Sequence, residues 1–570
     1  MVHTNDVLLK NDAEWLHFSR PHRVISTAKI SEVRAALQET EQLVNANNWH
    51  AAGFLSYEAA PAFDSALHIL EGADFPLLWF GLYDPPDRLQ LPAPGSSPDL
   101  SWRQTSDRES YNIAIEKIKD QIAAGRTYQV NYTMRLNSSF DGSAWDLFLA
   151  LAQTQNKYAA YIDLGRHVIC SASPELFFEL DGQVIKSSPM KGTAPRGRTT
   201  TEDGRQMDRL RNSEKDRAEN AMIVDMIRND IGRVAEVGSV HVPQLFRIEK
   251  FSSLFQMTST VEGRTYASVT DIFGALFPCG SITGAPKVST MKIISELENG
   301  PRRIYTGSIG FMAPHRKARF NVAIRTVLVD REARSAEYGV GGGVVWDSTS
   351  TGEYDEALLK ARVLTEPAPE FSLFETLLWT PEDGYFLFEK HVARLADSAE
   401  YFEFAFSPQQ MKEELQGLAR GFNSAQRVKI TLERTGRFTM EYGSFDPSVT
   451  SFKACLAEDP VHSQDIFLFH KTTHRKVYED SLAAHPEHQD VLLYNEKGEL
   501  TEFTIGNLVV QLQDGLYTPP MECGLLPGTF RAHLLETDKI RERVIQKSEL
   551  RECQKIFLIN SVRKWVEVQI

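Results

Sequence analysis

A chain of 570 residues is longer than a single hydrophobic core usually supports, so its length favours several domains. Hydrophobic residues make up 42% of the sequence, but it contains no run of about 18 apolar residues, which excludes a membrane-spanning helix and predicts no membrane partner. A net charge of −14 argues against a nucleic-acid partner, because a polyanion would be repelled at long range.

The start of the chain and the cysteines indicate the compartment. Residues 1–6 lack the basic and apolar regions of a secretory signal, so we expect a cytoplasmic protein. The five cysteines are few, odd in number and far apart, and none forms a Cys-x-x-Cys pair suited to zinc or redox chemistry. We therefore expect all of them to be reduced thiols.

Residues 1–365 are expected to form one large α/β body. The apolar spacing predicts helices over residues 30–44 and 111–124, and strands and helices then mix up to residue 365. A strand-like segment at 51–55 would have unpaired edges unless it joined a larger sheet. The first hundred residues are therefore not expected to form a separate domain, although a loop rich in Pro, Gly and Ser lies at 91–98.

A proline-rich linker at residues 366–371 is expected to separate this body from a second one over residues 372–570. Strands are predicted at 374–379 and 385–388, and a helix is predicted to begin around His391.

Each half has one prominent lysine. Lys191 lies in a segment rich in Gly and Pro in the first half, and Lys471 follows an apolar strand predicted at 466–469 in the second. The sequence therefore reads as two enzymes joined end to end.

Two acidic helices are predicted in the first half. Asp216 and Glu219 are three residues apart and share one face of a helix. A second helix carries Glu353, Glu356 and Lys360, again on one face. If the two faces meet, they form an oxygen-rich site of the kind that Mg2+ accepts, with room for a substrate carboxylate. The alternative is solvated helix surface, stabilised by pairing of Glu356 with Lys360.

Seven further segments follow one another in a fixed order. They are YQVNYT at 128–133, SPELF at 173–177, PMKGT at 189–193, the stretch 215–233, SITGAPK at 281–287, VAIRT at 322–326, and GGG at 341–343 followed by Asp347 and Ser348. In these segments the chain resembles the chorismate-utilising family, which includes anthranilate synthase component I, aminodeoxychorismate synthase component I and the isochorismate synthases.

The resemblance implies a fold of two packed antiparallel sheets with outer helices and an active site in the cleft between them. It implies that Glu219 and Glu356 bind Mg2+, and that Asp216 and Glu353 act through water. The residues implied to bind chorismate are Gln129, Thr283, Gly284, Tyr305, Arg325, Gly341, Gly342, Gly343 and Lys360. Arg325 and Lys360 would bind the pyruvyl carboxylate, because an anion needs a guanidinium or ammonium partner.

Two positions distinguish members of this family. Isochorismate-forming relatives have a water-activating lysine where this chain has Gln129, so water is not the expected nucleophile. Anthranilate synthases have alanine where this chain has Lys191, whereas aminodeoxychorismate synthases typically have lysine. By this resemblance Lys191 attacks C2 of the ring while the C4 hydroxyl leaves, and ammonia then enters at C4 and displaces the lysine. Glu175 is the implied acid for the departing hydroxyl.

Three positions depart from the family pattern. Cys279 replaces a glycine, so its turn is not expected to need a positive φ. Gln256 replaces a histidine seen in anthranilate synthases, and residues 156–158 differ from the stretch linked to tryptophan feedback. No cysteine lies in Gly-x-Cys-x-Gly, so ammonia is expected from solution or from a separate glutamine amidotransferase subunit.

Three motifs of the second half belong together. KTTHR begins at Lys471, EFTIGN lies at 502–507, and HVARL precedes both at 391–395. This set resembles the fold-type IV pyridoxal phosphate enzymes, which include branched-chain and D-amino acid aminotransferases and aminodeoxychorismate lyase. The resemblance covers about residues 372–570.

By this resemblance Lys471 binds the cofactor covalently, Glu502 keeps the pyridine nitrogen protonated, and Arg394 binds the phosphate. The remaining phosphate contacts would come from backbone amides and a hydroxyl, because glycine turns and helix starts direct N–H groups at anions. The cofactor-binding residues implied are Lys471, Arg394, Glu502, Ile505, Gly506 and Thr529.

The second half begins almost directly at residues 371–376, without the strands that usually precede this motif. Its small domain is therefore expected to be trimmed or to borrow support from the first half. A homodimer through the pyridoxal phosphate half is the assembly that the resemblance implies.

Together the two resemblances imply successive reactions. The first half would aminate chorismate to 4-amino-4-deoxychorismate, as an aminodeoxychorismate synthase component I does. The second would eliminate pyruvate to give 4-aminobenzoate for folate synthesis, as an aminodeoxychorismate lyase does. The alternatives are a second half that acts as a class IV aminotransferase on another amino acid, or one that is a non-catalytic docking module.

Overall fold

The fold is that of a computed structural model. It describes all residues except 1–2, 13, 73–74, 93–99, 153–156, 252–253, 362–368, 445, 447 and 449. Part of the loop expected at 91–98, part of the 156–158 stretch and half of the linker expected at 366–371 lie outside the described residues. No helix of the described part is long and apolar enough to cross a membrane.

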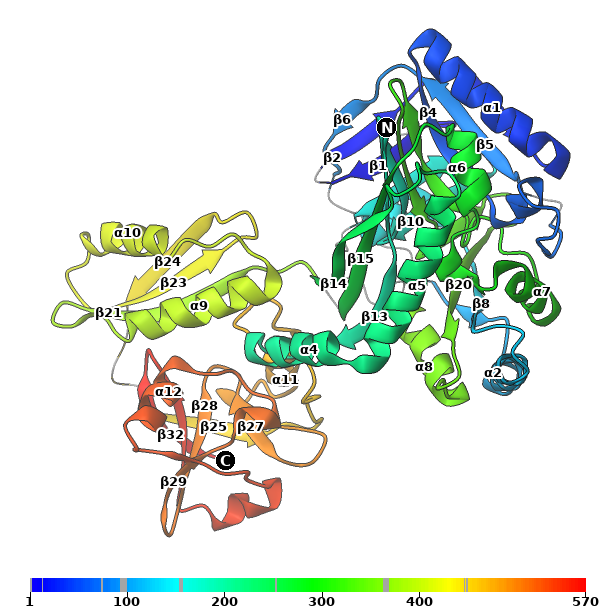
Figure 1. The fold of residues 1–570 in the computed structure, drawn as a ribbon. Helices are drawn as coiled ribbons and strands as arrows, with labels where there is room; N and C mark the ends of the chain where they lie inside the picture. The colour runs from blue at the N-terminus through cyan, green and yellow to red at the C-terminus, as the bar shows by residue number, and fades with distance from the viewer. Residues whose placement is uncertain are drawn as a thin grey trace. The chain divides into compact units, whose positions relative to one another are not determined.

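The chain divides into two compact units (Figure 1). The first comprises Met1–Pro195 and Met207–Ala368, and the second comprises Arg196–Gln206 and Pro369–Ile570.

The first unit contains two antiparallel sheets of ten strands each. One sheet has the order β16 (Gly284–Ala285), β8 (Gln129–Ser139), β20 (Ser335–Val344), β19 (Thr326–Asp330), β10 (His167–Ser173), β9 (Tyr158–Asp163), β1 (Val7–Asn11), β2 (Glu14–Phe18), β6 (Asp87–Leu89), with β7 (Arg103–Gln104) on β8. The other has the order β13 (Met190–Pro195), β15 (Leu254–Arg264), β12 (Val184–Ser188), β11 (Leu176–Asp181), β18 (Lys317–Val322), β17 (Ser308–Ala313), β4 (His50–Leu55), β5 (Leu78–Tyr83), β3 (Arg23–Thr27), with β14 (His241–Lys250) on β15.

Helices cover the outer faces of these sheets. They are α1 (Ile30–Asn47), α2 (Arg108–Ala123), α3 (Ala144–Ala152), α5 (Glu214–Gly232), α6 (Val269–Leu276), α7 (Lys287–Leu297) and α8 (Ser350–Ala361), with 3-10 turns η1 (Tyr57–Ala62) and η2 (Gly280–Ile282). α4 (Thr200–Asn212) follows β13, and its residues up to Gln206 belong to the second unit. One apolar cluster joins strands of both sheets, a second packs α1, α5 and α6 on the β4 sheet, and a third packs α2, α3, α7 and α8 on the β8 sheet. This arrangement is the two-sheet fold with outer helices that the sequence predicted.

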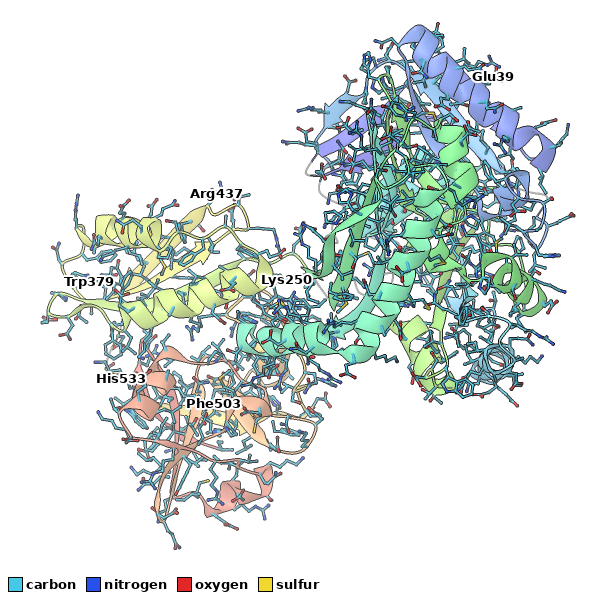
Figure 2. All side chains as sticks on the ribbon, in the orientation of Figure 1. Glu39, Lys250, Trp379, Arg437, Phe503 and His533 are labelled. Carbon is cyan, nitrogen blue, oxygen red and sulfur yellow. The ribbon has the colours of Figure 1, made fainter. Side chains whose placement is uncertain are left out.

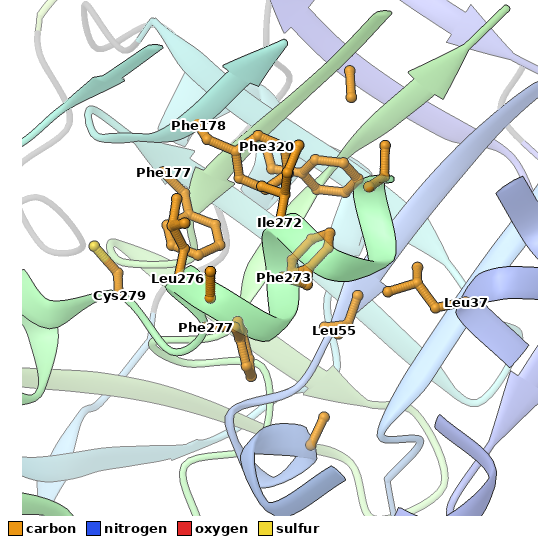
Figure 3. Close-up of a cluster of buried hydrophobic side chains, with 14 of the residues drawn as sticks. Leu37, Leu55, Phe177, Phe178, Ile272, Phe273, Leu276, Phe277, Cys279 and Phe320 are labelled. Carbon is orange, nitrogen blue, oxygen red and sulfur yellow. The ribbon is translucent and has the colours of Figure 1, made fainter. Parts of the chain in front are cut away.

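Aromatic side chains form the centre of the cluster beneath α6 (Figure 3). Phe273 projects from α6 and makes edge contacts with Phe178 and Phe320, at centroid distances of 5.2 and 4.9 Å. Edge-to-face packing suits the quadrupoles of the rings and adds to the free energy of apolar burial. The contact fixes α6, and with it the turn that leads to Cys279, against the sheet.

The second unit also contains two sheets, marked in Figure 2 by Trp379 and Phe503. The four-stranded sheet has the order β22 (Gly384–Tyr385), β21 (Leu373–Thr380), β23 (Gln426–Leu432), β24 (Phe438–Ser444). The eight-stranded sheet has the order β27 (Leu500–Phe503), β26 (Asp490–Tyr494), β25 (Ser451–Leu456), β32 (Lys564–Gln569), β31 (Lys555–Asn560), β28 (Asn507–Leu512), β29 (Gly515–Thr518), β30 (Arg541–Glu542). The helical elements are α9 (Phe388–Phe402), α10 (Pro408–Ala419), α11 (Lys476–Ala484), α12 (Thr529–Glu536), η4 (Ile466–Leu468), η5 (Met521–Cys523) and η6 (Lys547–Glu552).

Two predictions of local structure were wrong. The apolar run at 466–469 is not a strand but the 3-10 turn η4, because the side chain of Asp465 accepts a hydrogen bond from the amide of Phe467 and starts the turn. The strand expected at 385–388 ends at Tyr385, and α9 already begins at Phe388. A short apolar run has no periodicity that separates strand from helix.

The segment Arg196–Gln206 directly follows β13 in sequence but packs within the second unit. Arg196 forms a buried ion pair with Asp203 at 2.6 Å, and its guanidinium lies 4.2 Å from the ring centre of Tyr401. The Tyr401 hydroxyl donates a hydrogen bond of 2.6 Å to the carbonyl of Gly197. The second unit therefore includes a piece of the first half, in agreement with the expectation that it borrows support there.

The same segment contacts the residue that precedes Lys471. Nε2 of His470 lies 3.0 Å from the carbonyl of Arg198, and Nδ1 lies 2.9 Å from the hydroxyl of Ser398. Because a carbonyl can only accept, Nε2 carries the proton and Nδ1 accepts from Ser398. Burial lowers the pKa of His470 to about 4, which keeps this neutral form. The backbone next to Lys471 is therefore held in part by residues from the first half.

Replacing Arg196 with methionine should destabilise the second unit more than the first. The change leaves the carboxylate of Asp203 buried without its ion-pair partner, which typically costs about 3–5 kcal/mol. We expect hydrogen exchange of the full chain to rise in residues 398–402 and 468–472, measured by mass spectrometry after proteolysis.

The matched control is Arg211→Met, because Arg211 lies on α4, the helix that carries Asp203, in an exposed pair with Asp208. This change should leave exchange in the second unit unaltered. Equal exchange in the two variants would contradict the role given to the segment Arg196–Gln206.

Candidate functional site

Lys191 lies on β13, where a glycine lets a helix approach closely. The pairing of β13 with β15 is irregular between Met190 and Thr193, and Gly192 has a φ of 93°. A Cβ at Gly192 would lie 3.0 Å from Cβ of Asp216 on α5 and would also sit in the left-handed region that L side chains rarely adopt. Asn220 of α5 donates a hydrogen bond of 3.2 Å to the carbonyl of Lys191, so strand and helix are joined at this residue.

The Lys191 amine points at bare backbone of β20. A Cβ at Gly343 would lie only 2.4 Å from Nζ of Lys191 and 3.0 Å from Nε2 of Gln129, so both side chains occupy the space that a larger residue would fill. Both polar atoms of the Gln129 amide are buried without a hydrogen-bond partner. A buried amide without partners costs free energy, so this position suits a polar ligand that supplies them.

Carboxylates of α5 and α8 lie around the same glycines. Oε2 of Glu219 is 3.8 Å from Nζ of Lys191, and Oε1 of Glu356 is 2.8 Å from Nζ of Lys360. Lys360 also donates a hydrogen bond of 3.0 Å to the carbonyl of Gly341. Glu353 accepts a hydrogen bond of 2.6 Å from Ser348.

The carboxylates differ in their proton affinity. Burial raises the pKa of Glu219 and of Glu353, whereas the charge of Lys360 lowers the pKa of Glu356. The negative charges of Asp216 and Glu356 also raise the pKa of Glu219, and a bound cation would relieve this repulsion.

The donor set fits Mg2+, which prefers carboxylate oxygens. The carboxylates of Glu219 and Glu356 each lie against a lysine amine, Lys191 and Lys360 respectively. Within the residues that the structure describes, the carboxylates of α5 and α8 do not form a set of three with all ligand atoms within 4.8 Å.

Glu175 is a buried carboxyl group in the connection between β10 and β11. Its Oε1 accepts a hydrogen bond of 2.7 Å from Ser281, in the η2 turn. Burial raises its pKa to about 7, against the opposing charges of Lys191 and Lys360. At neutral pH the group is therefore protonated part of the time, as a general acid must be.

The other predicted pocket residues lie on neighbouring elements. The carbonyl of Thr283 accepts from the amide of Asn131, and Gly284 pairs with Val130, so this turn is fixed beside Gln129 on β8. The hydroxyl of Thr283, however, donates to the carbonyl of Cys279 at 3.0 Å and is engaged within its own turn.

Arg325 has the properties of an anion-binding group. Its guanidinium lies 6.0 Å from the ring centre of Phe251, and burial lowers its pKa. In the described part of the chain no carboxylate pairs with this guanidinium, so an anionic ligand could compensate its charge. The ring of Tyr305 lies 5.1 Å from the guanidinium of Arg135, and its hydroxyl stays protonated because burial raises its pKa to about 12.

Lys471 is the buried amine of the second unit. It lies 4.8 Å from the ring centre of Phe374. Burial and the nearby charge of Arg394 lower its pKa to about 7, although Glu375 and Glu502 oppose the shift. The amine is therefore neutral part of the time near pH 7, which both a nucleophile and a base require.

Glu502, at the end of β27, is fixed by three donors. Its oxygens accept from the hydroxyl of Tyr478 at 2.8 Å, the amide of Leu526 at 3.1 Å and the side chain of Asn507 at 3.1 Å. Burial raises its pKa to about 7. A cationic ring nitrogen placed here would find a fixed carboxylate to pair with.

Arg394 is oriented by a residue that the sequence analysis did not single out. Glu375 on β21 binds the guanidinium through two hydrogen bonds of 2.8 and 2.6 Å and also lies 2.7 Å from Nδ1 of His391. Nε2 of His391 is 3.3 Å from the hydroxyl of Thr529, the first residue of α12. These contacts bring Arg394 and Thr529 to one place. A lone acid inside the apolar strand β21 was the available sequence signal.

The remaining predicted cofactor residues form the turn after Glu502. Ile505 is about half exposed, and its carbonyl accepts a hydrogen bond of 3.2 Å from Asn560. The carbonyl of Gly506 accepts from the amide of Phe503 at 2.8 Å and closes the turn. The amides of this turn and of α12 are of the kind that bind anions.

Comparison with known proteins defines the class. A model of the family described as chorismate binding enzyme matches residues 5–366, more than half of the chain. The chain therefore belongs to the family of chorismate binding enzymes. A second model, amino-transferase class IV, matches residues 372–570, and the second unit has this fold.

Three relatives of the first half show what it resembles. Aminodeoxychorismate synthase component 1 of Escherichia coli (strain K12) is 39% identical over 269 residues, which cover 46% of this chain and 59% of that protein. Aminodeoxychorismate synthase of Streptomyces griseus is 40% identical over 45% of this chain and 36% of that protein. Anthranilate synthase component 1 1 of Haloarcula marismortui is also 40% identical, over 49% of this chain and 57% of that protein. The aminodeoxychorismate synthases and the anthranilate synthase are thus about equally similar to this chain, so sequence identity alone does not distinguish between their two products.

The chain spans between about a third and three fifths of the length of these relatives. Among solved structures, anthranilate synthase component I from Streptococcus pneumoniae has a TM-score of 0.53 and 23% sequence identity, and covers 64% of this chain and 91% of that chain. This likeness shows the fold of the first half.

Glu175→Gln should make the first unit less sensitive to pH. Burial raises the pKa of Glu175 from the ordinary 4.5 to about 7, so folding retains a proton that the unfolded chain releases. The stability contributed by this proton is full below about pH 4.5 and is lost as the pH rises to about 7. Between about pH 5 and about pH 8 the unfolding temperature of the wild-type chain should therefore fall more than that of the variant.

Differential scanning calorimetry without Mg2+ or ligand measures this difference. Glu109→Gln, on the exposed face of α2, is the control and should follow the wild-type chain. A parallel pH dependence in Glu175→Gln and wild type would show that Glu175 is ionised across this range.

Proposed function

We propose that the first half aminates chorismate at C4, giving 4-amino-4-deoxychorismate. The observation that carries this proposal is the position of the Lys191 amine, held beside Gly343 and next to the unpartnered amide of Gln129. Anthranilate-forming relatives are expected to have a small residue in place of Lys191. A buried amine facing a polar ligand pocket is suited to covalent catalysis.

The chemistry follows from the neighbours of Lys191. Its amine attacks C2 of the ring, a C–N bond forms, the ring double bond shifts, and the C4–O bond breaks. Glu175 gives its proton to the departing hydroxyl, so water leaves. Ammonia then forms a bond to C4, the electrons shift back, and Lys191 is released as the amine. The sum is chorismate plus ammonia giving 4-amino-4-deoxychorismate and water.

The charged residues around this pocket would hold the substrate. Arg325 and Lys360 are cations that suit the pyruvyl carboxylate, and Tyr305 with the backbone of Gly341–Gly343 would line the ring. Glu219 and Glu356 would bind Mg2+, with Asp216 and Glu353 acting through water, and the ion would neutralise the ring carboxylate. Ammonia would come from a partner glutamine amidotransferase, because no cysteine lies in Gly-x-Cys-x-Gly.

We propose that the second half acts on this product and releases pyruvate and 4-aminobenzoate. Its residues fit pyridoxal phosphate: a buried amine at Lys471, a fixed carboxyl group at Glu502, and Arg394 close to the start of α12 at Thr529. The amides of Ile505 and Gly506 would complete the phosphate site. When bound, this cofactor supplies an electron sink next to the amino group of the substrate.

Lys471 would carry out the proton transfer. With a pKa of about 7 its amine takes the C4 proton of the substrate at neutral pH. Loss of this proton and of the enolpyruvyl oxygen makes the ring aromatic, which drives pyruvate out. Glu502 would pair with the ring nitrogen of the cofactor, and Arg394 would bind the phosphate, while Glu375 keeps its guanidinium in place.

Lys471→Ala should stop the sequence after the first reaction. The purified chain is incubated with chorismate, Mg2+, ammonium and pyridoxal phosphate, and products are identified by liquid chromatography and mass spectrometry. We expect 4-aminobenzoate and pyruvate from the wild-type chain, and 4-amino-4-deoxychorismate alone from the variant, because removal of the amine removes the base.

The control is Lys476→Ala, an exposed lysine nearby on α11, which should not change the products. Accumulation of 4-amino-4-deoxychorismate by the wild-type chain itself would favour the alternatives, a class IV aminotransferase with another substrate or a docking module. Uptake of pyridoxal phosphate would separate these two alternatives.

Lys191→Ala should abolish formation of 4-amino-4-deoxychorismate, while the second reaction continues with supplied intermediate. The change removes the nucleophile but leaves the second unit intact, and we expect the first rate to fall by about 10²-fold or more. Rates are measured separately with chorismate and with 4-amino-4-deoxychorismate.

Lys186→Ala serves as the matched control, since this lysine lies on β12, which β15 separates from β13 in the sheet, and its amine is 3.2 Å from the carboxylate of Glu179. Anthranilate as the product of the wild-type chain would refute the role of Lys191. Unchanged amination by Lys191→Ala would refute the covalent step.

A further inference from the structure

A third group of reactive side chains lies in the second unit, apart from Lys471. Cys455 is on β25, His485 follows the last residue of α11, and His488 lies in the turn that leads into β26. The Sγ atom and one ring nitrogen of each histidine lie within 4.8 Å of one another. Among the described residues, no other three His, Cys, Asp or Glu side chains have ligand atoms this close together.

The backbone holds these three residues in place. β25 and β26 pair in parallel, with Cys455 opposite Val491. The amide of His488 donates to the carbonyl of His485 at 3.1 Å, which closes the turn. The amide of Gln489 donates to the carbonyl of Lys453 at 2.9 Å, and its side chain accepts from the amide of Lys453 at 2.9 Å. The turn is therefore attached to the strand that carries the thiol.

Nearby acids favour a cation at this position. Glu487, Glu458 and Asp490 lie close enough to act electrostatically on Cys455. Their negative charges would attract a metal ion, whose own charge favours the thiolate form of a cysteine ligand. Oε1 of Glu487 lies 2.8 Å from Nδ1 of His488, but among the described residues this buried nitrogen has no hydrogen-bond partner. A buried ring nitrogen without a partner is suited to bind a metal ion.

We propose that Cys455, His485 and His488 bind a zinc ion. A thiolate and two imidazoles are ligands that zinc prefers, whereas Mg2+ prefers oxygen. Three protein ligands leave one of four positions for water.

The ion would connect two parts of the proposed cofactor site. α11 begins at Lys476, shortly after Lys471, and β26 leads into β27, which carries Glu502. Zinc bound at the end of α11 would tie the connection between these two residues to β25. The proposal does not depend on which reaction the second half catalyses.

Zinc binding by the full chain is measured by competition with a chromophoric chelator, with Mg2+ in excess to occupy oxygen-rich sites. We expect one zinc per chain and at least a 10- to 100-fold weaker binding in Cys455→Ser and in His488→Ala, since even changes outside the ligand shell have this size of effect. X-ray absorption of the zinc complex should show one sulfur at about 2.3 Å and nitrogens at about 2.0–2.1 Å.

Cys553→Ser is the matched control, because Cys553 is also a half-buried thiol of the second unit, near the carbonyl of Glu549 at 3.5 Å. It should bind zinc as the wild-type chain does. Zinc should also raise the unfolding temperature of the wild type and of Cys553→Ser, but not of Cys455→Ser. Equal affinity in wild type and Cys455→Ser, or an absorption spectrum without sulfur, would overturn the proposal.

Discussion

The three consecutive glycines of β20 are the constraint on which the first site depends. They present bare backbone to the pocket, and side chains from separate elements fill the space that their Cβ atoms would need. Lys191 and Gln129 lie against Gly343, while Glu353 lies within 2.8 Å of the place where a Cβ of Gly342 would be. A strand without side chains thus lets an amine, an amide and carboxylates converge, which ordinary packing of residues on neighbouring strands would prevent.

The second site depends on two buried carboxyl groups, Glu375 and Glu502, whose pKa values are shifted in opposite directions. Burial pushes the pKa of Glu375 upward, but Arg394 and His391 hold it well below its usual range, so this group is always charged. Glu502 has neutral donors and a pKa raised to about 7. The first carboxylate can therefore fix a guanidinium permanently, while the second can respond to the charge of a bound ring. Environments that separate the pKa values of like groups are typical of catalytic sites.

The sequence predicted what is encoded locally and in order. The helices with Glu219 and with Glu356, the joining of the 51–55 strand to a larger sheet, and the ordinary φ of −57° at Cys279 were all confirmed. It failed where the decisive contact is remote. The segment 466–469 is too short for a hydrophobic periodicity that would distinguish a turn from a strand. The role of Glu375 in orienting Arg394 depends on a contact with a residue 19 positions later in the chain. The His-x-x-His pair at 485 and 488 was visible, but Cys455 joins it only through the pairing of β25 with β26.

The path of the chain also explains why a boundary at 366–371 describes the sequence better than the structure. Lys191 lies on β13, and a few residues later the chain enters the segment Arg196–Gln206, which packs with the second unit. There the carbonyl of Arg198 holds His470, the neighbour of Lys471. A second half cut at the linker would lose the Arg196–Asp203 pair and this carbonyl, and His470 would be buried without an acceptor for its proton. The first half of the sequence therefore supplies a segment to the second unit, although the two units have separate cores. This segment begins directly after β13, so the strand that carries Lys191 continues into the segment that contacts the neighbour of Lys471.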